Sequence, residues 1–138
     1  MKVVFCYHTT DMEYHVGIAF LDAAIKEANV ETGLVIYKEI AGKPHDTVNE
    51  TVERILDEDP TIVAFSVMTF NWRKIQAVIT DLRKRYSGPI IVGGSHAMLC
   101  PEEVLNFQGV DAVCLGDGEK PFKEMILFYH EHALDEIP

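Results

Sequence analysis

The stretch Thr61-Ile-Val-Ala-Phe-Ser66 decides the fold together with Pro89-Ile-Ile-Val92, which leads into Gly93-Gly-Ser-His96. Both runs are short, apolar and bounded by proline or glycine, which is typical of strands buried in a parallel sheet. Between them a helical pattern begins at Asn71, and its apolar residues recur at helical spacing as far as Tyr86. In open α/β sheets, ligands bind beyond the carboxyl ends of the strands. The sequence therefore predicts a binding site where these two strands end.

The same alternation of strand and helix extends toward both ends of the chain. Further strands are predicted at residues 2–7, 34–37 and 111–115, and further helices at residues 13–28, 48–56, 101–109 and 122–129. Gly33 is predicted to mark a turn, and Asp46 or Thr47 to cap the second helix. We expect an α/β, doubly wound, five-stranded parallel sheet with a flavodoxin-like (Rossmann-like) fold and strand order 2-1-3-4-5. The length of 138 residues suits a single domain, residues 1–138.

The charge balance argues against a nucleic-acid partner. The chain has 22 acidic and 12 basic side chains and a net charge of -10, whereas proteins that bind phosphate backbones carry clustered lysine and arginine. The one basic cluster, Arg83-Lys84-Arg85, falls in the last turn of the predicted third helix. Cations at that position suit the helix dipole, so we interpret the cluster as structural.

Membrane and secretory signals are absent from the sequence as given. No apolar run approaches the roughly 20 residues that span a bilayer, and the N-terminus leads directly into a strand. Cys6, Cys100 and Cys114 are odd in number and widely separated. That pattern favours free thiols in a reducing cytoplasm over a disulfide or zinc framework, and Cys6 and Cys114 are predicted to lie in strands as small core residues.

Three loops at the predicted carboxyl rim of the sheet are suited to a ligand. Ser66 and Thr69 offer hydroxyls after the third strand, and Gly93-Gly94 leaves bare backbone after the fourth. The segment Gly116-Asp-Gly-Glu119 repeats the glycine pair after the fifth strand. Because glycine lets a ligand approach the backbone closely, we expect the three loops to form one crevice.

Several α/β chemistries do not fit these loops. The first strand-to-helix turn, Cys6-Tyr-His-Thr-Thr-Asp11, has none of the glycines of a dinucleotide site. The chain has no Walker loop and no Gly-x-Ser-x-Gly elbow, and Ser66 stands where a phospho-receiver needs an aspartate. An FMN-binding flavodoxin relative is also less suitable, because the first loop offers a phosphate only Thr9 and Thr10.

The order of the rim motifs matches a known family. The matching motifs are Ser66-Val-Met-Thr-Phe-Asn71, Gly93-Gly-Ser-His-Ala97, Pro101-Glu-Glu-Val104 and Gly116-Asp-Gly-Glu119. Together they resemble the cobalamin-binding domain of cobalamin-dependent radical S-adenosylmethionine enzymes. The resemblance covers nearly the whole chain and is strongest from Ile62 to Phe122.

The resemblance implies that the dimethylbenzimidazole-bearing tail of cobalamin inserts between the sheet edge and the helices. Ser66 and Thr69 would bond the tail, Gly93 and Gly94 would give it room, and the later loops would line the tail and the corrin. The residues so assigned are Ser66, Val67, Met68, Thr69, Phe70, Asn71, Gly93, Gly94, Ser95, His96, Gly116, Asp117, Gly118 and Glu119. A crevice with hydroxyls, bare backbone and few charges also suits a large amphipathic cofactor.

The chain departs from other cobalamin proteins at the cobalt ligand. Methionine-synthase-like and mutase-like members carry Asp-x-His-x-x-Gly, and counting back from Gly17 puts Tyr14 and Met12 at the positions of the His and the Asp. His8 and His15 lie nearby at the wrong spacing. We therefore predict that no histidine of this chain binds cobalt as the His of that motif does. His8 is kept as a minor candidate for a contact near the metal.

A second departure limits the expected activity. The chain lacks Cys-x-x-x-Cys-x-x-Cys for an iron–sulfur cluster, so the cluster and S-adenosylmethionine would belong to a separate domain. We expect either an excised N-terminal domain of a larger radical enzyme or a stand-alone module, holding the corrinoid for methyl transfer or electron relay. We expect no complete active site in this chain, and we assign no catalytic residues to it. The alternative is a cofactor-free docking or regulatory domain of the same fold.

Overall fold

A parallel sheet of five strands forms the centre of the computed structural model, which describes residues 1–11, 15–116 and 118–131. The strands are β1 (Lys2–Thr9), β2 (Glu31–Lys38), β3 (Ile62–Ser66), β4 (Ile90–Gly93) and β5 (Ala112–Val113). They are ordered β2-β1-β3-β4-β5, and every neighbouring pair is parallel. The predicted fold class and strand order are therefore confirmed.

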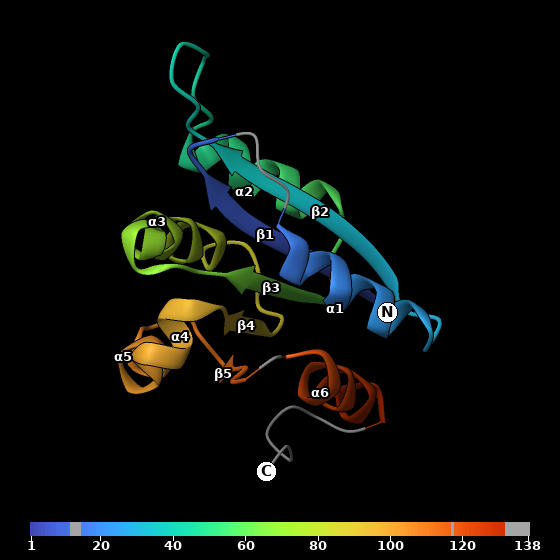
Figure 1. The fold of residues 1–138 in the computed structure, drawn as a ribbon. Coiled ribbons are helices and arrows are strands. Elements are labelled where there is room, and N and C mark those ends of the chain that lie inside the picture. The colour runs from blue at the N-terminus through green and yellow to red at the C-terminus, as the bar shows by residue number, and fades with distance from the viewer. Residues whose placement is uncertain (12–14, 117, 132–138) are drawn as a thin grey trace.

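Helices cover both faces of this sheet (Figure 1). The helical elements are α1 (Val16–Lys26), α2 (Val48–Asp57), the 3-10 turn η1 (Thr69–Asn71), α3 (Trp72–Leu82), α4 (Ser95–Leu99), α5 (Pro101–Asn106) and α6 (Glu119–Glu131). One face packs against α1 and α6, and the other packs against α2, α3, α4 and α5. Among the described residues, no helix is long and apolar enough to cross a bilayer.

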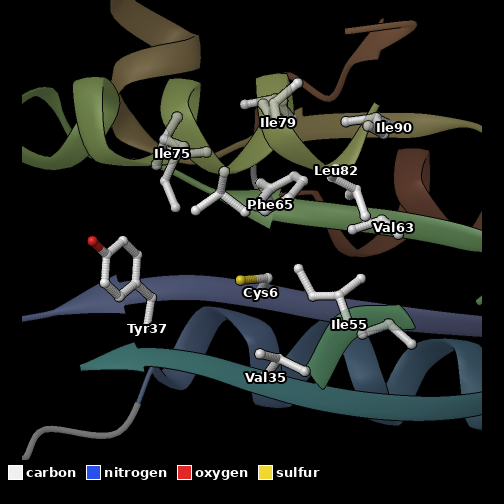
Figure 2. Packing of buried hydrophobic residues seen from close by; sticks show 14 of the residues in the cluster. Cys6, Val35, Tyr37, Ile55, Val63, Phe65, Ile75, Ile79, Leu82 and Ile90 are labelled. Carbon is white, nitrogen blue, oxygen red and sulfur yellow. The ribbon is translucent and has the colours of Figure 1, made fainter. Parts of the chain in front are cut away.

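The face toward α2 and α3 is densely filled (Figure 2). Alternate strand residues such as Val63 and Phe65 point into it, because successive side chains of a strand lie on opposite faces. Ile75, Ile79 and Leu82 of α3 meet them and are fully buried. The apolar side predicted for the third helix therefore lies in this core.

The first turn of α2 is fixed by a cap that the sequence offers. Thr47 accepts a hydrogen bond from the Glu50 backbone N–H at 3.1 Å, and the Glu50 carboxylate accepts one from the Thr47 N–H at 3.3 Å. This reciprocal pair is a capping box, so Thr47 rather than Asp46 caps α2. Asp46 instead accepts a hydrogen bond from the Lys38 N–H and pairs with Arg54.

Several element boundaries differ from those predicted. Gly33 lies inside β2 rather than in a turn, and β5 contains only two residues. A separate short helix, α4, precedes the one predicted at Pro101. The third helix ends at Leu82 rather than Tyr86, so the basic cluster follows it. Arg83 caps its end and donates hydrogen bonds to the carbonyls of Gly88 and Gly109, which the local pattern could not indicate.

Candidate functional site

A cavity of about 120 Å³ lies between the sheet and the helices α1 and α6, at the carboxyl end of the strands. Its walls come from β1, β3 and β4, the segment after β5, and the facing sides of both helices. The lining residues are Phe5, His15, Gly17, Ile18, Leu21, Ala64, Phe65, Ser66, Ile91, Gly93, Gly94, Cys114, Gly116, Gly118 and Phe122. An apolar cavity of about 150 Å³ accommodates a benzene ring, so this one is on the scale of a single small ring, and a larger flat group would need its walls to open.

The cavity exists because small residues stand where larger ones would fill the space. Ala64 and Ser66 occupy alternate positions of β3 on this face, and Ser66 pairs with Gly93 of the neighbouring strand. A Cβ added at Gly93 would have Cys114 as its nearest neighbour, at an ordinary 3.5 Å from the carbonyl oxygen. The missing side chain at Gly93 therefore leaves usable space at the end of β4.

Gly94 has a different requirement from Gly93. Its φ is +101°, and a Cβ there would lie 2.5 Å from the Val67 carbonyl oxygen and 2.8 Å from the Val67 nitrogen. The surrounding backbone is held by Val67 N–H donating to the Gly93 carbonyl and His96 N–H donating to the Val67 carbonyl. Glycine is needed at position 94 for both conformation and space.

His15 closes the cavity from the start of α1. Its Nδ1 accepts a hydrogen bond from the Ile18 N–H at 3.2 Å and caps the helix, and its Nε2 lies 2.7 Å from the Ser66 Oγ. Because Nδ1 is an acceptor, the neutral ring carries its proton on Nε2, which donates to the serine oxygen. Burial lowers the pKa of His15, and a hydrogen bond with the backbone opposes that shift only in part. The Ser66 hydroxyl proton is then free to be donated elsewhere.

A second, more open depression of about 420 Å³ adjoins the cavity at His15 and Gly17. It lies over the end of β1 and is bordered by Met68 and Phe70 of the loop after β3. Both side chains are exposed, Phe70 to 64%. A narrow cavity beside a broader apolar depression can take a ligand with a flat tail and a wide body.

His8 lies in the wall of this depression but is already engaged. Its Nε2 is 2.9 Å from Glu39 Oε1, and Glu39 also pairs with Lys74. Burial raises the pKa of Glu39, but hydrogen bonds from Lys74 and His8 outweigh it, so the net pKa is lowered. The other ring nitrogen of His8, Nδ1, is buried without a hydrogen-bond partner in the structure, so it does not face the open depression.

The structure brings part of the predicted set together. Ser66, Gly93, Gly94, Gly116 and Gly118 line the cavity, and Met68 and Phe70 border the depression. Three other predicted residues, Val67, Asn71 and His96, are buried away from the cavity and the depression, and three more, Thr69, Ser95 and Glu119, are exposed. Asp117 lies outside the described residues, as do Met12 and Tyr14 at the positions of the missing cobalt-ligand motif.

The buried members of that set have structural contacts instead. Asn71 accepts a hydrogen bond from the Met68 N–H and donates one to the His8 carbonyl, which ties the loop after β3 to the end of β1. Thr69 Oγ1 lies 3.1 Å from His96 Nδ1. For these residues a role in ligand contact stays a prediction.

Sequence reasoning missed the helix-side wall of the cavity. Ile18, Leu21 and Phe122 fall in the predicted helices 13–28 and 122–129 and were not assigned to the site, and Cys114 was predicted as a small core residue. Burial raises the pKa of the Cys114 thiol, so it is an apolar part of the wall. His15 had one usable signal, since a polar residue directly before a helix is a candidate cap.

Comparison with known proteins agrees with this geometry. The model of the B12-binding family, described as the B12 binding domain, matches residues 6–126. No curated protein matches the chain. The matched segment runs from β1 into α6 and includes every lining residue of the cavity except Phe5. The chain belongs to the B12-binding domain family, and the cobalamin-binding identity expected from its sequence is confirmed at that level.

Proposed function

We propose that the chain binds cobalamin at the carboxyl rim of the sheet, with the nucleotide tail in the cavity and the corrin over the adjoining depression. The observation that carries this proposal is the cavity itself, whose walls combine apolar side chains with glycine backbone and the Ser66 hydroxyl. All of its lining residues except Phe5 lie in the segment that matches the B12-binding family. The cavity and the depression meet at His15, as they must if one ligand occupies both.

The residues present fit the tail. A benzimidazole is flat and mostly apolar but carries nitrogen acceptors, so it needs an apolar slot with few donors. Ser66 supplies one donor, because His15 Nε2–H satisfies its oxygen and leaves its hydroxyl proton available. In this proposal His15 is a positioning residue that acts through Ser66.

The residues near the depression also support cobalt without a protein imidazole. Both nitrogens of His15 are engaged, one by the Ile18 N–H and one by Ser66. One nitrogen of His8 is held by Glu39 and the other is buried. Neither ring presents a free lone pair toward the depression. This agrees with the sequence, in which Met12 and Tyr14 stand at the positions of the Asp and the His of the cobalt-ligand motif.

The proposed role is to hold cobalamin for a separate radical S-adenosylmethionine domain, to which residues 1–138 would be the N-terminal cobalamin domain. When bound, the corrinoid supplies methyl transfer or electron relay, and the chain supplies position and water exclusion. The iron–sulfur cluster and S-adenosylmethionine would be held by that other domain. We place this function in the cytoplasm, because Cys6, Cys100 and Cys114 are all free thiols.

The test is reconstitution with hydroxocobalamin, desalting and an absorption spectrum of the protein fraction. We expect close to one equivalent of corrinoid, with band positions of a cobalt that lacks an imidazole ligand. Cobinamide, which has the corrin but no nucleotide tail, should be retained far less. A colourless protein in both cases would favour the docking alternative. Equal retention of the two corrinoids would contradict the proposal that the nucleotide tail binds in the cavity.

A matched pair of variants places the test at the cavity. Gly93→Leu adds a side chain where the nearest atoms leave room, so the protein should fold but lose cobalamin. Ser87→Leu adds the same side chain at an exposed position before β4, at the opposite end of the strand, and should retain the cofactor. Retention by Gly93→Leu at the wild-type level would contradict the proposed position of the tail.

A further inference from the structure

Three metal-binding side chains converge on the other side of the sheet from the tail cavity, where α4 meets α5. They are His96, Cys100 and Glu103, and their ligand atoms all lie within 4.8 Å of one another. The spacing of four and then three residues brings them to one side of the α4–α5 turn. None of the three lines the cavity or the rim depression.

His96 is the least explained residue of the three. It is only 5% exposed, and its Nε2 is buried without a hydrogen-bond partner in the structure. The other nitrogen, Nδ1, lies 3.1 Å from the Thr69 hydroxyl. If Nδ1–H donates to Thr69, the lone pair of Nε2 points toward the Glu103 carboxylate, 3.5 Å away. In that tautomer two electron-rich atoms face each other, and either a proton on Nε2 or a cation between the two atoms removes the repulsion.

The partners of His96 and Glu103 are those expected around a metal. Metal-bound histidines almost always donate their second N–H to an oxygen, as His96 can to Thr69. Metal-bound carboxylates are themselves hydrogen-bonded, and the Trp72 indole N–H donates to Glu103 Oε1 at 2.9 Å. The indole also packs against the His96 ring, with centroids 5.6 Å apart. Both side chains are therefore oriented from outside the cluster.

Cys100 completes the set at the junction of the two helices. Its N–H donates to the His96 carbonyl at 2.8 Å, and its carbonyl accepts from the Val104 N–H. The thiol is half-buried and not in a disulfide. These backbone bonds fix the cysteine relative to both other residues.

We propose that His96, Cys100 and Glu103 bind a divalent cation of the zinc class, with a water molecule as the fourth ligand. Imidazole, thiolate and carboxylate together suit Zn²⁺, which is held at about 2.0–2.3 Å in tetrahedral sites. Such bond lengths put ligand atoms about 3.3–3.7 Å apart, so atoms now up to 4.8 Å apart need to approach by about 1–1.5 Å at most. The bound ion joins α4 to α5 and, through the His96 N–H bond to Val67, steadies the Gly94 turn. His96 is thereby a metal ligand rather than a corrin contact.

The test is titration of the cobalamin-free chain with Co²⁺ as a spectroscopic probe, followed by displacement with Zn²⁺. We expect one equivalent of Co²⁺ with tetrahedral absorption and a thiolate-to-cobalt charge-transfer band, both lost when Zn²⁺ is added. Cys100→Ser should abolish the charge-transfer band, and Glu103→Gln should weaken binding by about tenfold or more. Glu102→Gln is the matched control, because Glu102 is the neighbouring exposed carboxylate on the same turn of α5.

The variants are compared with wild type for folding by circular dichroism and for melting temperature with and without Zn²⁺. Zn²⁺ should raise the melting temperature of the wild type and of Glu102→Gln but not of Cys100→Ser. A charge-transfer band that survives in Cys100→Ser would overturn the proposal, and so would the absence of stoichiometric metal from the wild type. Because no corrinoid is present, the outcome is independent of whether the chain binds cobalamin.

Discussion

The two faces of the central sheet are built from the same strands and both carry a buried core, but the core toward α1 and α6 gives way to a cavity at the carboxyl end of the strands. Toward α2 and α3, β3 presents Val63 and Phe65, which are buried in a filled core (Figure 2). Toward α1 and α6, the same strand presents Ala64 and Ser66, which border a cavity. Since alternate residues of a strand face opposite sides, small side chains at every second position leave space on one face while the other face stays filled. The comparison shows that one strand can contribute to a stabilising core on one face of the sheet and to a cavity on the other.

The densely packed face should show the largest effect on stability. Ile79→Ala removes three carbons from a fully buried site in α3, so we expect the free energy of unfolding to fall by about 2–5 kcal/mol. Urea denaturation followed by circular dichroism measures the loss. Val16→Ala, at an exposed position of α1, should stay within about 0.5 kcal/mol of wild type. A loss below about 1 kcal/mol at Ile79 would show that this face is not tightly packed.

A second pair of variants separates backbone strain from space at the end of β4. Gly94→Ala forces a side chain at a φ of +101° and 2.5 Å from the Val67 carbonyl oxygen, so we expect a loss of about 1–3 kcal/mol and of cobalamin retention. Gly93→Ala meets no atom closer than 3.5 Å and should fold with nearly wild-type stability. Urea titration and corrinoid retention are measured on both proteins. Equal stability of the two would mean that the Gly94 turn is not constrained as described.

The sequence predicts the architecture well because its signals are local. Apolar strands such as residues 61–66, helical periodicity in residues 72–86 and the glycine pair at 93–94 each report on their own neighbourhood. Their alternation is enough for the parallel sheet and for the rim where small residues gather.

The features that were missed depend on contacts between distant segments. Arg83 follows α3, and its guanidinium bonds carbonyls near β4 and β5. His15 lines the cavity beside Ser66, which lies 51 positions away in sequence but 2.7 Å away in space. Likewise, His96 follows the predicted rim but turns toward Trp72 and Glu103 on the packed side. No periodicity encodes such pairs.

The smallest expected effect is a pH dependence at His15, where the cavity wall meets the helix cap. Burial lowers the pKa of its imidazole in the folded chain below the ordinary 6.5. As the pH falls through about 6.5, the unfolded chain takes up the proton first, so stability present above that pH is progressively lost. The loss ends once the pH passes below the lowered folded value. Protonation also removes the Nδ1 lone pair that caps α1 through the Ile18 N–H.

His15→Asn isolates this contribution, because asparagine can cap a helix but does not titrate. Urea denaturation at pH 7.5, 6.5 and 5.5 should show the wild type losing more stability than the variant over the lower part of this range. On the cobalamin-bound protein, retention by the wild type should weaken over the same interval, since a protonated His15 no longer holds Ser66 and the helix together. Parallel plots of stability against pH for the two proteins would mean that His15 is solvated in the folded state. Water would then enter the cavity, contrary to what its apolar lining implies.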